Sequence, residues 1–146
     1  MKIRTGFVSN SSSSSFVIVG NVFDNNVIHE LLLNEDALKR FNERHGTSFS
    51  SFDDALESGD YCLSYDVFNA ILEGTDLVAY VDEYSEEAAV GIDPCNEMKN
   101  EDTLEDFKKR VSDDFKKIGV DVPVDDIRFI TGSIDSSGET YIEGRG

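Results

Sequence analysis

The run Met1-Lys-Ile-Arg-Thr-Gly-Phe-Val-Ser-Asn-Ser-Ser-Ser-Ser-Ser-Phe-Val-Ile-Val-Gly20 opens the chain and has its best-defined pattern. Phe16 to Val19 ends in three successive β-branched residues, which favour a pleated strand because a helix restricts their side-chain rotamers. A continuous apolar run of this length is typical of a strand buried on both faces. The pattern predicts a central strand, and we expect either Val17→Asp or Ile18→Asp to collapse the fold.

A serine tract separates this strand from an earlier β-prone stretch. Ile3, Phe7 and Val8 predict a first strand. Ser9 to Ser15 compete for backbone hydrogen bonds, which is typical of a turn. A flexible linker, or a loop that binds an anion beside Arg4, stays open as an alternative. Neither glycine-rich nucleotide-binding fingerprint occurs in the sequence.

The same opening run resembles that of known proteins. Arg4-Thr-Gly-Phe-Val-Ser-Asn-Ser-Ser-Ser-Ser-Ser-Phe16 is similar to the start of a group of small uncharacterised proteins encoded by tailed bacteriophages. A weaker likeness runs from Gly91-Ile-Asp-Pro94 through Met98-Lys99 and Thr103-Leu104 to Phe107-Lys108. The resemblance implies a phage source, and therefore a place in the host cytoplasm or in the virion. It implies no activity.

Length and composition indicate one folded domain over residues 1–146. Hydrophobic residues make up 39% of the chain, with ten Phe and five Tyr, which is enough for a core. No run of eighteen apolar residues occurs, so we expect no membrane span. Cys62 and Cys95 are not spaced as zinc ligands and are expected to be ordinary thiols.

The charge of the chain is strongly acidic and unevenly placed. The net charge is −17, and residues 51–106 hold seventeen of the thirty acidic residues but only one basic residue, Lys99. An acidic field repels nucleic acid and anionic membranes and attracts basic proteins. The alternative is that the charge only keeps a small protein soluble and monomeric.

Apolar spacing and capping residues predict the remaining elements. Val27–Leu32 and Glu35–His45 predict two helices or one bent helix, with Asn34 and Gly46 as caps. We further expect three helices: a short one capped by Ser50 or Ser51, one over Val67–Leu72, and an amphipathic one over Leu104–Ile118. The expected strands are Tyr61–Tyr65, Leu77–Val81, Ala88–Ile92, Ile127–Ile134 and Thr140–Glu143. Together these predict an α+β fold, with a mostly antiparallel sheet of five or six strands on which one long C-terminal helix and several short helices pack.

Matches to catalytic motifs are short and lack context. Glu97-Met-Lys99 matches the E-x-K pattern of metal-dependent nucleases, but it falls in an expected loop. Nothing in the sequence brings His29 or His45 to a nucleophile. No calcium-loop pattern accompanies the clustered carboxylates. We therefore expect no catalytic residues, no metal and no cofactor.

Two charged groups are the candidate interaction sites. An acidic belt on a hairpin connection is expected to attract a basic partner. A basic face on the amphipathic helix either pairs with acids of its own helix or docks on the acidic surface of a second copy, which would build a homo-oligomer. The acidic belt comprises Asp82, Glu83, Glu86 and Glu87, and the basic face comprises Lys108, Lys109 and Arg110.

These observations favour a phage-encoded, non-enzymatic interaction protein that binds a basic or nucleic-acid-binding host protein. Direct binding to nucleic acid or membrane is not expected, because the net charge repels both. The first alternative is a virion-associated accessory or structural protein, which would use its sheet edges and basic face for assembly. The second is a metal-dependent nuclease or hydrolase, for which no site can be identified.

Overall fold

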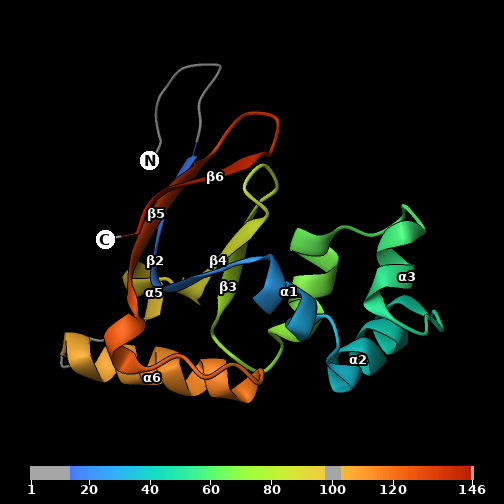
Figure 1. Ribbon diagram of the computed structural model, residues 1–146, viewed down its shortest axis with the longest axis horizontal. Coiled ribbons are helices and arrows are strands. Elements are labelled where there is room, and N and C mark those ends of the chain that lie inside the picture. Colours follow the sequence, from blue (N-terminus) through green and yellow to red (C-terminus); the bar gives the residue numbers. More distant parts are fainter. Residues whose placement is uncertain (1–13, 98–102, 146) are drawn as a thin grey trace.

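The computed structural model describes residues 14–97 and 103–145. The first strand expected over Ile3–Val8, Arg4, the serines up to Ser13 and the segment that contains Lys99 lie outside the described residues. The remainder is an α+β fold in which a five-stranded antiparallel sheet is packed by several helices (Figure 1). The expected fold class is therefore confirmed at this level.

The strand that begins at Ser14 is the centre of the sheet, as the sequence predicts. This strand, β2 (Ser14–Phe23), pairs with β4 (Glu87–Ile92) on one side and with β5 (Arg128–Ile134) on the other. The edge strands are β3 (Val78–Asp82) and β6 (Thr140–Gly144). The strand order is thus β3-β4-β2-β5-β6.

Helices occupy the β2–β3 and β4–β5 connections, and turns join β3 to β4 and β5 to β6. The region of the first two predicted helices holds two separate helices, α1 (Asn25–Leu31) and α2 (Glu35–His45), and the side chain of Asn34 caps the second one. The others are α3 (Phe52–Glu57), the π-helix η1 (Leu63–Val67), α4 (Phe68–Ile71), α5 (Pro94–Glu97), α6 (Leu104–Lys117) and the short 3-10 helix η2 (Val124–Asp126). Among the helices that the structure describes, none combines the length and the apolar character needed to cross a membrane.

Two sequence predictions about these elements are wrong. The strand predicted over Tyr61–Tyr65 is replaced by η1, because the carbonyl of Cys62 accepts hydrogen bonds from the N–H groups of both Asp66 and Val67 and closes a wide helical turn. The longest helix, α6, is not C-terminal, since β5 and β6 follow it. It begins at Leu104, as predicted, and the side chains of Thr103 and Asp106 form a reciprocal capping box.

The sheet is curved, and each of its two faces contributes to a hydrophobic core. Helices pack on the convex face, and a smaller cluster of side chains fills the concave face. On the convex face, α6 buries Phe107, Val111 and Phe115 in the main core together with Val19 and Phe23 of β2. Figure 1 shows α6 running along one end of the sheet. The concave face holds a second cluster of Phe16, Ile18, Ala89 and Ile130. Tyr80 of β3 closes this cluster, because its ring stacks on that of Phe16 with the centroids 4.0 Å apart. The central strand therefore contributes to both cores.

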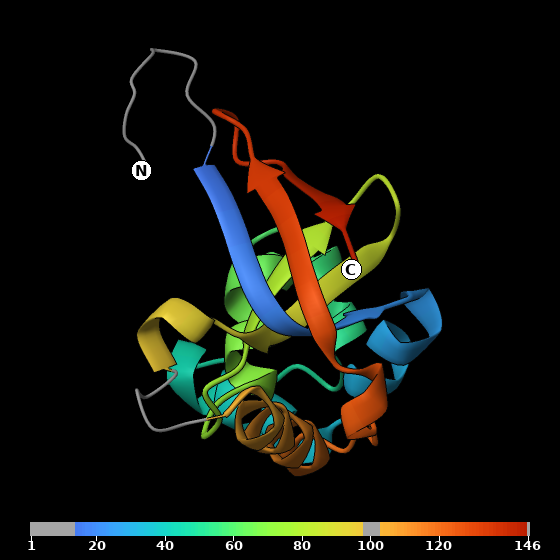
Figure 2. The same cartoon turned by 90° about the vertical axis from the view of Figure 1, so that its left-hand side faces the viewer.

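Burial of the central strand is not continuous, which corrects the expectation for Val17. Ile18 and Val19 have no exposed surface, but the Val17 side chain is 42% exposed. Successive side chains of a strand point to opposite faces, so Val17 shares the convex face with Val19. The upper part of β2 rises beyond the helices (Figure 2). The Val17 side chain is left partly uncovered.

Glycines let the sheet coil tightly around the concave core. Gly20 of β2 lies opposite Gly91 of β4, and a Cβ atom on Gly20 would stand 2.0 Å from the carbonyl oxygen of Val90. Such pairs permit a close approach of backbones that other residues prevent. The coil brings the two edge strands, β3 and β6, near each other although they stand at opposite ends of the strand order.

Substitution on the two faces of β2 should have unequal effects. Ile18→Asp places a charge in the concave core with no partner, so we expect a loss of about 4 kcal/mol or more, which most small domains do not survive. Val17→Asp, the matched control, should cost about 1 kcal/mol, because Asp is a poor strand former but stays in water. Urea unfolding followed by circular dichroism measures both. Equal midpoints would show that Ile18 is not a core residue.

Candidate functional site

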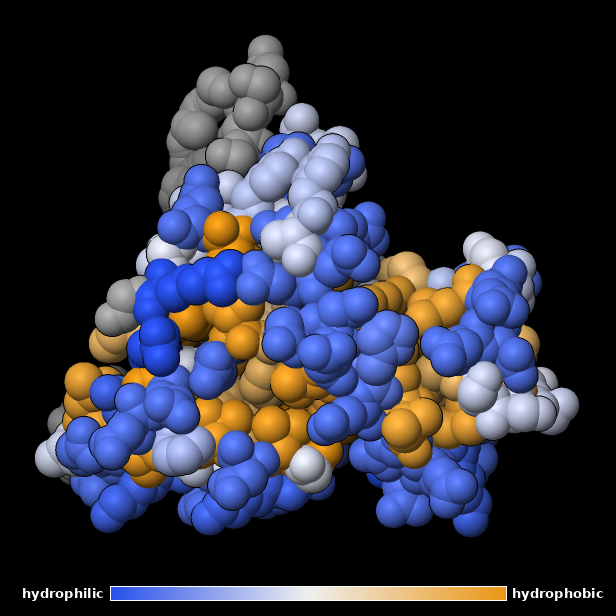
Figure 3. Space-filling view, viewed as in Figure 1, coloured by the Kyte–Doolittle hydropathy of each residue, from blue (hydrophilic) through white to orange (hydrophobic). Residues whose placement is uncertain are grey.

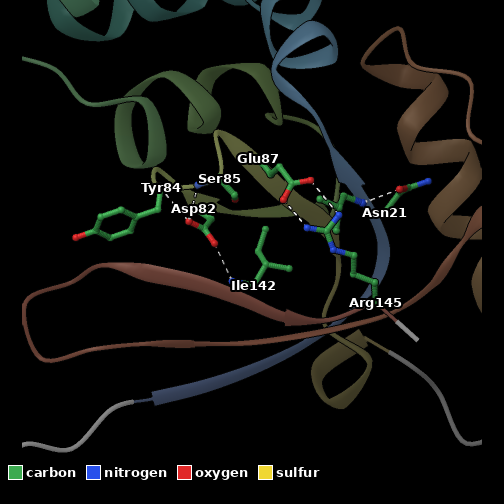
Figure 4. A network of polar contacts seen from close by, with 8 residues as sticks. Asn21, Asp82, Tyr84, Ser85, Glu87, Ile142 and Arg145 are labelled. Carbon is green, nitrogen blue, oxygen red and sulfur yellow. Dashed lines mark hydrogen bonds and ion pairs between the residues drawn. The ribbon is translucent and has the colours of Figure 1, made fainter.

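Asp82 of the acidic belt is buried, and its side chain links the edge strands β3 and β6 by a hydrogen bond. Its side chain is only 6% exposed. Oδ1 accepts hydrogen bonds from the backbone N–H groups of Tyr84 (3.1 Å) and Ser85 (3.2 Å), and Oδ2 accepts from that of Ile142 in β6 (3.1 Å; Figure 4). Three amide donors satisfy a carboxylate well. Asp82 therefore stabilises the fold and does not face a partner.

Glu87 is also engaged within the molecule. Its two carboxylate oxygens accept hydrogen bonds from the two terminal nitrogens of Arg145, which reaches across from the end of β6 (Figure 4). The hydrogen bond from Arg145 holds the pKa of Glu87 below its usual value, and the same contact raises the pKa of Arg145. The structure thus divides the acidic belt, since only Glu83 and Glu86 are exposed.

A cluster of two tyrosines and a glutamate lies beside the link between Asp82 and β6. The rings of Tyr84 and Tyr141 stack with centroids 5.9 Å apart, and both hydroxyls donate hydrogen bonds to Glu139 (3.1 and 2.9 Å). These bonds to a carboxylate raise the pKa of both phenols. Asp135 fixes the adjoining β5–β6 turn by accepting from Ser137 N–H and Oγ–H, and the Ser137 hydroxyl lowers the pKa of Asp135.

A groove of about 880 Å³ opens next to this cluster, along the edge strand β3. Leu77 to Val81 form its floor, η1 and α4 form one wall, and the β5–β6 turn closes one end. Figure 3 shows hydrophobic surface in the notch between the β3–β4 hairpin and the helices. Its apolar and aromatic lining includes Tyr65, Phe68, Leu72, Tyr80, Tyr84 and Ile134.

The charged side chains that line the groove are all acidic among the described residues. They are Glu73, Glu83 and Glu139. Glu73 is neutralised by Arg40 and Arg44 of α2, so it adds little to the field of the groove. Glu83 and Glu139 remain as exposed carboxylates, at the end of the groove where the β5–β6 turn lies. Of the predicted acidic belt, Glu83 alone lines this groove.

The predicted basic face lies elsewhere in the molecule. Lys108, Lys109 and Arg110 are on α6, which contributes no residue to the groove. Lys109 is exposed, whereas Lys108 and Arg110 are half-buried. The Arg110 guanidinium lies 5.3 Å from the ring centroid of Phe107, a distance at which a cation and an aromatic face attract. The structure does not bring the acidic belt and the basic face together.

The residues weighed for catalysis are scattered. His29 is exposed on α1, and the His45 ring packs between those of Phe41 and Tyr61, with centroids 4.5 and 4.8 Å away. Within residues 14–97 and 103–145, no group of three or more His, Cys, Asp or Glu side chains could hold a metal ion. The Glu97-Met-Lys99 match extends beyond the described residues.

The groove is the feature that sequence reasoning missed. Its walls come from segments more than sixty residues apart, η1 near Leu63 and the turn near Gly138, and no local pattern joins them. One signal was present in the sequence. The strand Val78-Ala-Tyr-Val-Asp82 has neither Lys nor Pro, the residues that commonly protect an exposed sheet edge.

Removing the Asp82 carboxylate should destabilise the protein. Asp82→Ala leaves three backbone N–H groups without their acceptor, and we expect the free energy of unfolding to fall by about 3 kcal/mol. Asp82→Asn keeps one acceptor oxygen and should lose roughly half as much. The exposed neighbour Glu83→Ala is the control, expected within about 0.5 kcal/mol of wild type. Urea unfolding measures the midpoints, which should rise from Asp82→Ala to Asp82→Asn to Glu83→Ala. A different order would contradict the role of Asp82 as an acceptor of three backbone hydrogen bonds.

The Glu87–Arg145 contact predicts a dependence on pH. Because the native pKa of Glu87 is lowered, the contact stabilises the fold above the unfolded pKa, and this contribution is lost as pH falls through the native pKa. Arg145→Gln should raise the native pKa of Glu87 towards its ordinary value. A titration of the Glu87 side-chain carbon by NMR measures the change. An unaltered titration curve in the variant would show that Arg145 does not contact Glu87 in solution.

Comparison of the chain with models of protein families, with curated proteins and with solved structures finds no match.

Proposed function

We propose that this chain is a phage-encoded, non-enzymatic interaction protein that binds a basic segment of another protein. The observation that carries the proposal is the groove along β3, which combines an apolar lining with the exposed carboxylates of Glu83 and Glu139. The start of the chain, which resembles proteins of tailed phages, supports the source. A basic or nucleic-acid-binding host protein is the partner class that fits this chemistry.

The lining of the groove suits a peptide with mixed chemistry. Binding sites in proteins are mostly apolar clefts with a few placed polar groups, and about 300–1,000 Å³ is their usual volume. Burial of apolar side chains against Phe68 and Leu72 would supply affinity. Carboxylates at the rim mainly raise the association rate and select against acidic partners. The net charge of −17 acts in the same direction over a longer range.

A virion accessory role is the second candidate, and one observation favours it. β3 is a terminal strand of the described sheet, and such an edge can pair with another chain during assembly. In that case a second copy or a capsid or tail protein would occupy the groove. The two candidates differ in the charge of the occupant, which can be measured.

Charge removal in the groove should slow binding of a basic peptide. The probe is a fluorescent peptide of alternating valine and lysine, added to the full chain. Glu83→Gln with Glu139→Gln should reduce the association rate by about tenfold at low salt, because steering depends on nearby opposite charge. Raising salt to 1 M, where the Debye length is about 3 Å, should remove most of that difference. Stopped-flow fluorescence measures the rates.

Matched control variants distinguish the effect of charges in the groove from the effect of net charge on the association rate. Asp125→Asn with Asp126→Asn removes two exposed carboxylates from η2, outside the groove, and should change the rate by less than about twofold. Lys109→Gln on α6 should leave the rate unchanged or raise it slightly. If the valine–lysine peptide does not bind, or if both acidic pairs matter equally, the groove is not an acidic binding site.

A further inference from the structure

We propose that the occupant of the groove binds as an added β-strand on the free edge of β3. This inference rests on the proposed function and specifies its binding mode. The occupant is an extended segment in which apolar and basic residues alternate. Its backbone would pair with Val78–Asp82, and its side chains would alternate between the helices on one side and the concave cluster on the other.

The edge of β3 has unused backbone groups. In the described sheet β3 pairs with β4 alone, in continuous register from Val78 opposite Gly91 to Asp82 opposite Glu87. In an antiparallel pair, every second residue directs its N–H and C=O to the partner and the residues between direct theirs outward. The outward set of β3 faces the groove, because the groove is lined by all residues from Leu77 to Val81.

This edge also lacks the usual protection against pairing. Sheet edges are commonly guarded by Lys, Pro, a bulge or a covering loop. The β3 sequence contains neither Lys nor Pro, and its pairing with β4 shows no irregularity. Val78 at its start is 38% exposed. The strand ends in the buried Asp82, but its apolar and regular stretch Val78–Val81 is a template for strand addition, a common mode of peptide recognition.

The other edge of the sheet is different. The pairing of β6 with β5 contains a register shift between Thr131 and Gly132. The Ile142 N–H of β6 is already bonded to Asp82, and Arg145 crosses to Glu87 at the end of the strand. These contacts engage one backbone N–H group of β6 and the side chain that follows its last residue. The bond to Asp82 joins the two edges at one end of β3, and the rest of the β3 edge, from Val78 to Val81, lines the groove.

The side chains beside β3 set the sequence preference of the occupant. Tyr80 belongs to the concave cluster, whereas Ala79 and Val81 pack with the main core. An added strand would therefore place alternate residues near Tyr80 and Ile134, and the others near Phe68 and Leu72. Basic residues directed towards the β5–β6 turn would meet Glu83 and Glu139. Alternation of valine-like and lysine-like residues satisfies both requirements.

Charge disfavours a second copy of this chain as the occupant. Pairing of two β3 edges would bring together two chains that each carry a net charge of −17. Like charges brought together oppose association. A basic segment gains from the same field. The observations therefore favour a basic partner over self-assembly at this edge.

Backbone N-methylation of the probe tests the binding mode without changing its charge. Two versions of the valine–lysine peptide are compared with the parent, one methylated on the valine nitrogens and one on the lysine nitrogens. An added strand bonds β3 through only one of these sets. We expect one version to lose at least about tenfold in affinity and the other to retain it, since each lost bond removes part of the binding free energy. Fluorescence anisotropy measures both.

Amide hydrogen exchange locates the contact on the protein. Saturation with the parent peptide should slow exchange at alternate residues of Val78–Asp82, and exchange at β6 residues should change little. Equal effects of the two methylated peptides, or unchanged exchange in β3, would overturn strand addition. If the parent peptide binds with the charge and salt dependence described above but gives either of these two results, the groove is still an acidic binding site. Only the proposal that the peptide binds as an added strand would then be wrong.

Sedimentation at rising protein concentration tests the competing occupant. The chain should stay monomeric at concentrations where the peptide binds. A dimer that forms at low salt and excludes the valine–lysine peptide would show that the β3 edge pairs with a second copy, and the proposal would be wrong.

Discussion

The carboxylate of Asp82 holds the two edges of the sheet together, and the shape of the molecule depends on this tie. It accepts three backbone N–H groups, two from the connection after β3 and one from β6. A buried carboxylate is costly unless such donors surround it. The bonds from Tyr84 and Ser85 fix the β3–β4 connection, and the bond from Ile142 joins it to the β5–β6 hairpin. The position of the groove beside β3 follows from that placement.

Coiling of the sheet is the second requirement, and small residues permit it. The facing glycines Gly20 and Gly91 allow β2 and β4 to approach closely where the sheet bends. Phe16 and Tyr80 then meet across the concave side, where a flat sheet would leave both rings exposed. The sheet acquires a second small core, and β3 becomes an edge strand with one apolar wall beside it. Curvature and the open edge thus have a common origin.

The acidic residues serve two physical purposes that charge counting cannot separate. Asp82 and Glu87 form internal contacts, as does Glu73 with the arginines of α2. Glu83 and Glu139 remain exposed beside an apolar surface. Arginine side chains offset the charges of Glu87 and Glu73, so the field around the groove depends more on Glu83 and on Glu139. The Glu139 carboxylate accepts hydrogen bonds from the neutral hydroxyls of Tyr84 and Tyr141. This division supports a binding surface that is smaller and more specific than an acidic belt.

The sequence by itself determined the local structure. β-branched residues from Val17 to Val19 specified a strand, and Asn34 and Gly46 specified helix ends, because capping and strand preference act over a few residues. The five described strands and the α+β class followed from such patterns. The sequence misjudged Tyr61–Tyr65, where burial of Val67 and Phe68 beside a wide helical turn outweighed an alternating pattern. It also placed the longest helix at the end of the chain, although two strands follow it.

Only the tertiary structure decided which face of β2 is uncovered at Val17, which carboxylates are internal, and where a groove forms. These features depend on backbone segments far apart in the chain, whose approach is set by sheet curvature and packing and leaves no periodic signal in the sequence.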